Sequence, residues 1–465
     1  MTEALEERRP AEPARPAQPV PARPAKAAAA IALAVLATVP GVSLRLTGTH
    51  LPPPLAALLL GMAVVGAAFL LSWAAEAVQL DISSGLAIGL LALIAVLPEY
   101  AVDFVFAWKG GTSVRRFGAS CPPLDVGAES PCSLALANMT GSNRLLIGVG
   151  WSLVVFVAWY RHWRARRPQV GVVLGREHSV ELAYLALATA YSLSLPLKGT
   201  VTLVDALVLV GIFAAYTWRI ARGPVEEPHL VGPAAALGAL ATARRRAAVT
   251  AIFVVAAGVI VLVAEPFADA LVATGAELGV SEFLLVQWLA PLASEAPELL
   301  VALVFAWRLN TDAALGTLLS SQVNQWTLLV GTLPVVFAVA SATAHGLPID
   351  VSQREELLLT AGQSFFAVAV LANLRISNLE AVTLFGLFWA QFVLGALVPA
   401  SVHGLERLVV SALYLVLGTA ILLRDRARLP LLLRQGLLLS PADLQGAGRA
   451  QGEGMGEPSS ARGRA

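Results

Sequence analysis

The chain has 465 residues, of which 57% are hydrophobic and only 14% are charged, and its formal net charge is +1. Ordinary soluble domains carry about 25% charged residues, so this composition excludes a soluble globular protein. Apolar runs of about 20 residues recur along most of the chain, as in transmembrane helices. The runs are continuous rather than alternating, which favours membrane-spanning helices over a β-barrel.

The segments before the first apolar run and after the last one are predicted to be tails. Residues 1–26 are rich in Pro, Ala, Arg and Glu and contain no apolar stretch, which is typical of disorder rather than of a cleaved signal peptide. Residues 424–465 form the second tail. A further segment, 222–247, contains Pro, Gly and Arg and is predicted to link two halves of the chain.

About twelve transmembrane helices are predicted between the two tails. In chain order they cover residues 27–47, 54–80, 84–108, 132–159, 178–196, 201–221, 248–275, 281–308, 314–341, 355–373, 379–400 and 404–423. The first and last are extra helices. The others form two five-helix repeats, 54–221 and 248–400. The expected fold class is therefore an all-α integral membrane protein.

The distribution of Lys and Arg predicts how these helices are oriented. Basic residues gather in the first tail, in the loop 161–167, in the linker and at the start of the second tail. All four segments fall on one side, which the positive-inside rule assigns to the cytoplasm. The loop 109–131, with Lys109, Arg115 and Arg116, is the exception and is expected outside. Both termini are thus predicted in the cytoplasm of a cell-membrane protein, and the two repeats are inverted.

One motif occurs twice, 199 positions apart. Leu97-Pro98-Glu99 precedes Trp108 by nine residues counted from the glutamate, and Ala296-Pro297-Glu298 precedes Trp307 by the same distance. A proline within a helix cannot donate a hydrogen bond to the carbonyl four residues earlier. The carbonyls of Ile94 and Ala293 are therefore predicted to be free. Freed carbonyls beside intramembrane carboxylates are typical of a cation site.

A second polar patch follows each copy of the motif. Asn138 and Ser142 are four residues apart and share one helix face, and Thr317, Ser321 and Gln325 form the same kind of stripe. Ser321 follows Glu298 by 23 residues, whereas Ser142 follows Glu99 by 43. The difference of 20 residues is an insertion in the first copy.

These paired patterns resemble the cation/calcium exchanger superfamily, whose sodium/calcium exchangers contain two inverted repeats. The hallmark of that family is Gly-Thr/Ser-Ser-x-Pro-Glu on one helix and Gly-Ser-Asn-x-x-Asn/Asp on the next. Residues 97–99 and 296–298 match the first element, Gly141-Ser142-Asn143 matches the second, and 320–322 matches it loosely. The resemblance covers about 54–400. It implies a secondary active antiporter that exchanges calcium or another cation for sodium or protons by alternating access.

The expected ligands and partners follow from the motifs and the resemblance together. The partners are calcium, sodium, protons and membrane lipid, with no cofactor beyond the transported cations. We find no nucleotide loop, zinc spacing or activated nucleophile, so neither an enzyme nor a nucleic-acid partner is expected. The candidate metal ligands are Glu99, Glu298, Glu295, Ser294, Ser142, Ser321, Asn138, Gln325 and the carbonyls of Ile94 and Ala293.

Several departures from the family pattern keep a second interpretation open. Ala95 and Val96 stand where the family places hydroxyls, and Leu146 stands at a polar position. Arg144 lies two residues after Ser142 and could neutralise a glutamate in place of a cation. The alternative is a non-transporting regulatory or scaffold membrane protein with an exchanger fold.

Three further features of the sequence admit two interpretations each. Asp103 could line an exit path or lie near the outer interface, and the latter is favoured. Asn138, Asn143, Gln322 and Gln325 could be interhelical hydrogen-bond partners rather than ligands. Cys121 and Cys132 lie in or beside the inserted loop, where an exterior location permits a disulfide, but Cys132 could instead begin a helix as a free thiol.

Overall fold

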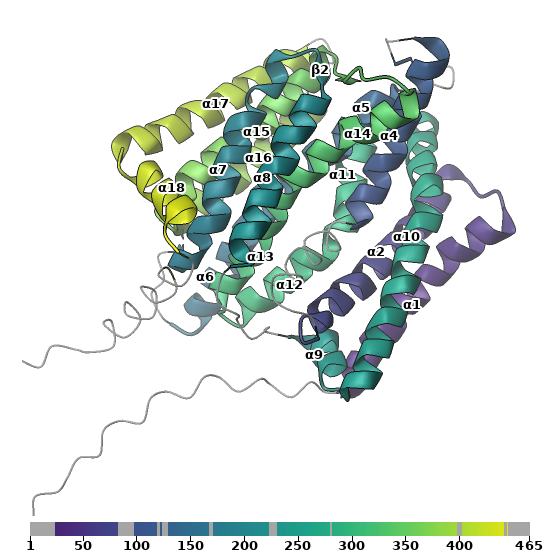
Figure 1. Ribbon diagram of the computed structural model, residues 1–465, viewed down its shortest axis with the longest axis horizontal. Coiled ribbons are helices and arrows are strands. Elements are labelled where there is room, and N and C mark those ends of the chain that lie inside the picture. Colours follow the sequence, from purple (N-terminus) through teal and green to yellow (C-terminus); the bar gives the residue numbers. More distant parts are fainter. Residues whose placement is uncertain are drawn as a thin grey trace, which may run out of the picture.

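The structure is a computed structural model that describes residues 24–81, 97–118, 121–122, 129–166, 171–222, 230–279, 281–397, 402–440 and 444. Within these residues the protein is a bundle of helices with two very short β-ribbons (Figure 1). Ile94, Ala95 and Val96 lie outside the described residues, as does most of the predicted span 84–108.

The helices of the first half follow the predicted spans closely. They are α1 (Pro24–Thr47), α2 (Pro53–Val78), α4 (Leu97–Phe117), α5 (Pro131–Leu145), α6 (Ser152–Arg164), α7 (Ser179–Ser192) and α8 (Leu203–Ile220). A π-helical turn, η1 (Leu146–Trp151), joins α5 to α6 in one continuous span, and the 3-10 turns η2 (Arg176–His178) and η3 (Leu195–Leu197) flank α7.

The second half repeats this pattern after a short helix, α9 (Gly232–Gly238). Its helices are α10 (Thr242–Leu278), α11 (Glu282–Ser294), α12 (Ala296–Trp307), α13 (Thr311–Asn324), α14 (Val330–Ser341), α15 (Val351–Leu371), α16 (Asn378–Leu397), α17 (His403–Arg424) and α18 (Arg428–Leu438). A second π-helical turn, η4 (Gln325–Leu329), joins α13 to α14.

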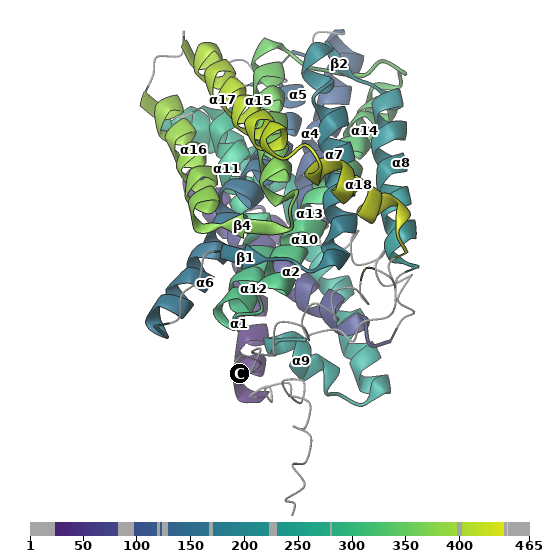
Figure 2. The ribbon, with the colours of Figure 1, turned by 90° about the vertical axis from the view of Figure 1, so that its left-hand side faces the viewer.

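Two antiparallel ribbons connect the halves of the chain. Strand β1 (Gly171–Val173) pairs with β4 (Arg375–Ser377), and β2 (Thr200–Val201) pairs with β3 (Leu347–Pro348). Each ribbon therefore joins one first-half strand to one second-half strand. Figure 2 shows β1 and β4 together below α15 and α16, and β2 at the top of the bundle.

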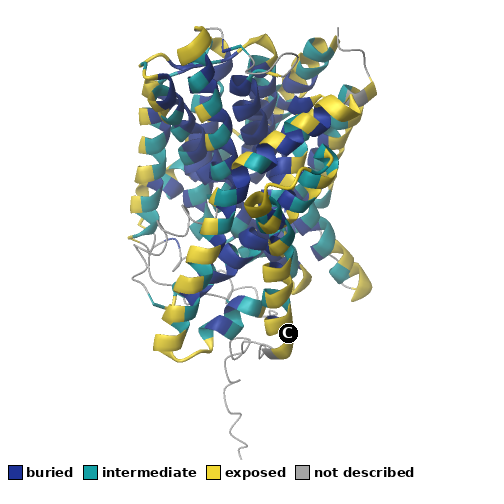
Figure 3. Cartoon of the chain, turned by 90° about the vertical axis from the view of Figure 1, so that its right-hand side faces the viewer, coloured by how far each residue is buried: buried dark blue, intermediate teal, exposed yellow. Residues whose placement is uncertain are grey.

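The outer surface of the bundle suits lipid rather than water. Large apolar side chains such as Leu33, Leu207 and Val261 are about 70% exposed or more, while the buried residues lie inside (Figure 3). Among the described residues, nine helices are long and apolar enough to cross a membrane, or ten if the bent pair α11–α12 counts as one span. The prediction of an all-α membrane protein is confirmed.

Two helices extend beyond the boundaries predicted from the sequence. Helix α4 continues to Phe117, so Lys109 and Arg115 are helical rather than part of a loop, and Lys109 pairs with Asp269 of α10. Helix α10 begins at Thr242 and includes Arg245. The predicted boundaries differ because charged residues favour loops, whereas Lys109 and Arg245 each pair with an acid of another segment, Asp269 and Asp81.

The two cysteines are joined in a disulfide between Cys121 and Cys132, with their Cα atoms 6.4 Å apart. The bridge closes the connection between α4 and α5, and Gly110 of α4 lies against it, since a Cβ there would be 2.9 Å from the Cys132 sulfur. Of the two alternatives left open by the sequence, the structure contains the disulfide.

Candidate cation-binding site

The two Pro-Glu motifs occupy equivalent helix starts. Glu99 lies in the first turn of α4 and is 1% exposed, and Glu298 lies in the first turn of α12 and is 9% exposed. Pro297 stands within the first two positions of α12, where its missing N–H is tolerated. Helices α11 and α12 meet at an angle of 53°. The break therefore holds Glu298 within the bundle.

A third acid, Glu295, lies in the break itself and is 1% exposed. Its carboxylate accepts a hydrogen bond from the Gln325 amide and interacts electrostatically with both Glu99 and Glu298. Ser294, the last residue of α11, is buried beside Glu99 and donates its own hydroxyl proton to the carbonyls of Ala290 and Pro291. Its oxygen lone pairs remain available.

A fourth acid, Asp103, follows Glu99 by one helical turn and is fully buried. It accepts a hydrogen bond of 2.7 Å from the Asn138 amide of α5. The Asp103 side chain therefore points toward α5 within the bundle. Asn138 does act as an interhelical partner, as one of its two interpretations had it.

The second polar patches of the two halves touch each other. Gln322 of α13 donates to the Asn143 side-chain oxygen of α5 at 2.6 Å. These residues are 179 positions apart, as are Ser142 and Ser321. Equivalent residues of the two halves thus meet in the centre of the bundle. Ser142 is fully buried, and Ser321 is half-buried.

Both polar patches run directly into the π-helical turns. Turn η1 begins at Leu146 and η4 begins at Gln325, again 179 positions apart. A π turn adds a residue to the helix and is frequent at functional sites. In the second half it places the Gln325 amide against Glu295.

The site contains many buried oxygens that accept no hydrogen bond from the described residues. They belong to four acids and four neutral side chains: Glu99, Asp103, Glu295, Glu298, Asn138, Ser142, Gln322 and Gln325. Among the described residues, no lysine or arginine forms an ion pair with any of the four acids. Carboxylate, amide and hydroxyl oxygens are the ligands that hard cations prefer.

Arg144 lies outside the cluster of acids and pairs with other residues. Its guanidinium pairs with Glu356 of α15 at 2.8 Å, donates to Gln391 of α16 and lies over the Trp288 ring at 5.0 Å. Glu356 also pairs with Arg407 of α17 at 2.8 Å. Arg144 therefore does not neutralise the glutamates of the Pro-Glu motifs. This removes one of the observations on which the non-transporting interpretation rested.

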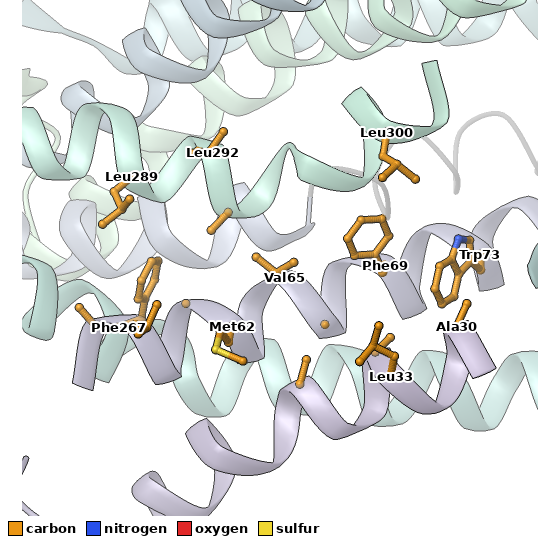
Figure 4. Close-up of a pocket in the computed structure, with 17 residues that line it drawn as sticks. Ala30, Leu33, Met62, Val65, Phe69, Trp73, Phe267, Leu289, Leu292 and Leu300 are labelled. Atoms are coloured by element: carbon orange, nitrogen blue, oxygen red, sulfur yellow. The ribbon is translucent and has the colours of Figure 1, made fainter. Parts of the chain in front are cut away.

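Ala293 lies one residue before Ser294 and faces a different environment. It is part of the lining of an apolar groove of about 600 Å³ between α1, α2, α10, α11 and α12 (Figure 4). Labelled side chains such as Phe69, Phe267 and Leu292 come from three of these helices. The groove contributes no charged side chain, so any cation ligand from Ala293 would have to be its carbonyl oxygen.

Glu76 of α2 is a site residue that the motif analysis did not identify. One of its carboxylate oxygens is buried without a hydrogen-bond partner, and the group interacts electrostatically with Glu298. The sequence contained a signal, since Glu76 stands alone among apolar residues of one span. Its position at the end of α2 places it between the site and the central linker, whose Val231 backbone it contacts.

Comparison with known proteins gives a consistent result. A family model described as sodium/calcium exchanger protein matches residues 53–221 and 248–397, more than half of the chain. The chain is 39% identical to a solved H+/Ca2+ exchanger CAX, with a TM-score of 0.79 over 89% of this chain and 98% of that one. No curated protein sequence matches it.

A more distant similarity concerns the fold alone. The structure of native YfkE is 13% identical, with a TM-score of 0.56, and the match covers 82% of this chain and 99% of that protein. The resemblance predicted from the repeated motifs is confirmed. Because this is a family of transporters, the chain is not an enzyme, and its ligands are the transported cations. The chain therefore belongs to the sodium/calcium exchanger family and is a multi-pass membrane cation antiporter.

Proposed function

We propose that this protein exchanges Ca²⁺ for protons by alternating access, with Glu99 and Glu298 as shared ligands. The observation that carries the proposal is a cluster of four buried acids that, within the described part of the chain, has no basic partner and is surrounded by oxygens that accept no hydrogen bond. Carboxylates this close cannot all remain ionised in the absence of a cation. Protons and a divalent cation therefore compete for the same oxygens.

The choice of ions rests on residues of the site and on one relative. The relative that is 39% identical is an H+/Ca2+ exchanger. Ala95 and Val96 carry no hydroxyl, and Glu295 adds a carboxylate, so the site has fewer neutral ligands and more charge than a sodium-coupled exchanger would need. Sodium as the coupling ion is the less favoured alternative.

The proposed ligand set divides into charged and neutral groups. The carboxylates of Glu99 and Glu298 bind the ion directly, and Glu295 tunes its affinity and pH dependence. Four neutral side chains contribute oxygens: Ser142, Ser294, Asn138 and Gln325. Ser321 and the Ala293 carbonyl complete the ligands from the second half. The Ile94 carbonyl is a ligand from the first half. Asp103 and Glu76 accept the displaced protons on their way out of the site.

Alternating access requires two halves that can rock against each other, and we propose that the twelve spans form two inverted repeats with one extra helix at each end. The contact between Asn143 and Gln322 supports a pseudo-two-fold axis at the site. The two ribbons support it as well, because exchanging the halves turns β1–β4 into β3–β2 at the opposite end.

We further propose a cell-membrane location with both termini in the cytoplasm. The basic residues of α6, the central linker and the end of α17 support this side assignment. The disulfide at the opposite end supports it independently, because disulfides persist in an oxidising exterior. The apolar outer surface and the groove of Figure 4 would contact lipid tails.

Flux measurements in proteoliposomes test the proposal. Wild-type protein should accumulate Ca²⁺ when an outward proton gradient is imposed, and Glu99→Gln or Glu298→Gln should each reduce the flux at least 100-fold. Glu265→Gln is a matched control, since Glu265 is an exposed acid on α10 that pairs only with Arg45. Flux driven by sodium but not by protons would contradict the coupling, and flux unchanged in both site variants would contradict the site.

A further inference from the structure

A second group of metal-ligating side chains lies outside the cation-binding site. Glu177 and His178 belong to turn η2, which leads into α7, and Asp312 lies in the first turn of α13. These elements come from the two halves of the chain and meet at the end of the bundle that carries the β1–β4 ribbon. None of these residues belongs to the repeated motifs.

The ligand atoms of this group are close enough to share one ion. Each of the residues Glu177, His178 and Asp312 offers one ligand atom, and these three atoms lie within 4.8 Å of one another. The His178 Nε2 is 3.3 Å from an Asp312 carboxylate oxygen, and the His178 Nδ1 is 3.7 Å from the carboxylate of Glu181. Three acids therefore surround a single imidazole.

Two glycines hold these side chains in place. A Cβ at position 316 would lie 2.3 Å from the His178 Cε1, and a Cβ at position 175 would lie 2.0 Å from a Glu177 carboxylate oxygen. The Gly175 N–H also donates to the second Asp312 oxygen at 2.7 Å. The group is thus positioned by the backbone of η2 and by α13, rather than by flexible surface contacts.

Charge and hydrogen bonding distinguish this group from an ordinary ion pair. Within the described part of the chain, Glu181 and Asp312 form ion pairs only with His178. The His178 Nδ1 and one Glu181 oxygen are buried without a hydrogen-bond partner. A simple tether between α7 and α13 would need one carboxylate, whereas here the carboxylates of both Glu181 and Asp312 lie against the same imidazole.

We propose that Glu177, His178 and Asp312 bind a divalent transition-metal ion of the Zn²⁺ or Mn²⁺ class, separate from the transported cation. An imidazole with carboxylates suits these ions better than it suits Ca²⁺. The Asp312 side chain is 41% exposed, so the ion can enter from water. Glu181 completes or orients the ligand set. Bound metal joins α7 to α13 and stabilises the packing of the two halves.

Zn²⁺ titration of the purified full-length protein tests this inference. A Glu99→Gln/Glu298→Gln background removes the cation-binding site, so that the result does not depend on the proposed transport function. In this background we expect one equivalent of Zn²⁺ to bind in calorimetry and to raise the melting temperature. His178→Ala and Asp312→Asn should each weaken binding at least tenfold.

His345→Ala provides the matched control, because His345 is exposed in the connection between α14 and α15 at the other end of the bundle. This variant should bind Zn²⁺ as the background does. If the background binds no Zn²⁺, or if His178→Ala and Asp312→Asn both bind it with unchanged affinity, the inferred site does not exist. Asp312→Asn keeps the shape of the side chain, whereas His178→Ala removes the ring. Weaker Zn²⁺ binding in both variants would therefore indicate a lost ligand rather than a folding defect.

Discussion

Arg144 is the residue that bears on whether the protein can bind a cation, because an arginine paired with the site glutamates would take the place of the ion. It is 1% exposed, and its partners are Glu356, Gln391 and the Trp288 ring. Glu356 is shared with Gln287 of α11, at 3.0 Å, and with Arg407 of α17. The arginine therefore anchors α5 to α15 and α16 and leaves the acids of the cation-binding site without a fixed positive charge.

Substitution Arg144→Gln should lower stability without changing Ca²⁺ binding. Removing one member of a buried ion pair costs up to about 3–5 kcal/mol. The melting temperature in detergent should fall, and the Ca²⁺ affinity of the folded fraction should stay the same. Arg45→Gln is the control, because its pair with Glu265 is exposed and should contribute about 0–1 kcal/mol. An increase in Ca²⁺ affinity in Arg144→Gln would mean that the arginine competes with the cation.

Glu99 and Glu298 could be proposed as ligands from the sequence because the motif is duplicated, and duplication is visible without a structure. The contacts of Asp103 and Glu76 could not be predicted from the sequence. Hydropathy places a residue in a span, but it does not reveal which neighbouring helix its side chain faces. Asp103 meets Asn138 across 35 residues of chain, and that pairing depends on how α4 is rotated against α5.

Helices α5 and α11 approach each other closely at Gly141. A Cβ on Gly141 would lie 1.7 Å from the Gln287 carbonyl oxygen, which no side chain can tolerate. Gly141 precedes Ser142, so the same glycine that allows the approach also sets the position of a candidate ligand. Small residues commonly allow such close packing between membrane helices.

Gly141→Ala should therefore impair both folding and transport. Forcing an extra carbon into a packed interior typically costs about 1–3 kcal/mol, and more where backbone must move. We expect reduced yield of monodisperse protein, and loss of Ca²⁺ flux in what remains. Gly211→Ala on α8 is the matched control, since nothing lies within 4 Å of its Cβ position. Equal behaviour of the two variants would show that the close approach is not essential.

The end of α2 is fastened to the start of α10 by a charged contact. Asp81 accepts hydrogen bonds from Arg245 at 2.7 and 2.8 Å and from Arg246 at 3.0 Å. The Arg245 hydrogen bond, with Arg246 assisting, lowers the pKa of Asp81 to about 2. Because this pKa lies below the value of about 3.9 in an unfolded chain, the contact stabilises the fold above about pH 4. That stabilisation is lost only as the pH falls toward 2.

Asp81→Asn should consequently lower the melting temperature by the same amount at pH 5, 6.5 and 8. Hydrogen bonds to charged groups contribute about 1.5–3 kcal/mol, so the decrease should be measurable by thermal unfolding in detergent. A loss that varied strongly between pH 5 and 8 would contradict the assignment. Constant behaviour would exclude this contact as the origin of any pH dependence of transport in that range.

The helices themselves were largely predictable, whereas their irregularities were not. Apolar runs located α2, α7 and α17 to within a few residues. The π-helical turns η1 and η4 add one residue per turn, which changes the side-chain direction without changing hydropathy. The sequence marks the break at Pro297, but its angle of 53° depends on the packing of α11 and α12 against neighbouring helices.

The proposed orientation of the whole molecule rests on basic residues at one end and a disulfide at the other. Both cysteines of the chain are paired, so the wild-type protein offers no free thiol to a maleimide. Single cysteines introduced at exposed positions can therefore report which side of the membrane they face.

His345→Cys and Ala427→Cys provide that test. Both positions are exposed, the first between α14 and α15 and the second between α17 and α18. A membrane-impermeant maleimide should label His345→Cys in intact cells and label Ala427→Cys only after the cells are permeabilised. The opposite pattern would invert the proposed topology, and labelling of both in intact cells would contradict the predicted number of spans between them.

At this scale the sequence predicts two repeats, a central linker and the family, and the match to the family model confirms the family. It could not determine how the halves meet. The direct contact of Asn143 with Gln322, and the pairing of each ribbon across the halves, arise only when the chain is folded. The first of these contacts joins equivalent residues of the two halves beside the candidate site, and this is the geometric basis of the proposal that the halves share a cation.

Proton release on Ca²⁺ binding tests the central claim most directly, namely that one set of carboxylates holds either protons or the cation. Purified protein in weakly buffered detergent solution, followed with a pH indicator, should release at least one proton for each Ca²⁺ bound. The double variant Glu99→Gln/Glu298→Gln should show neither binding nor release, and Glu265→Gln should behave as the wild type. Ca²⁺ binding by the wild type without any proton release would contradict the account.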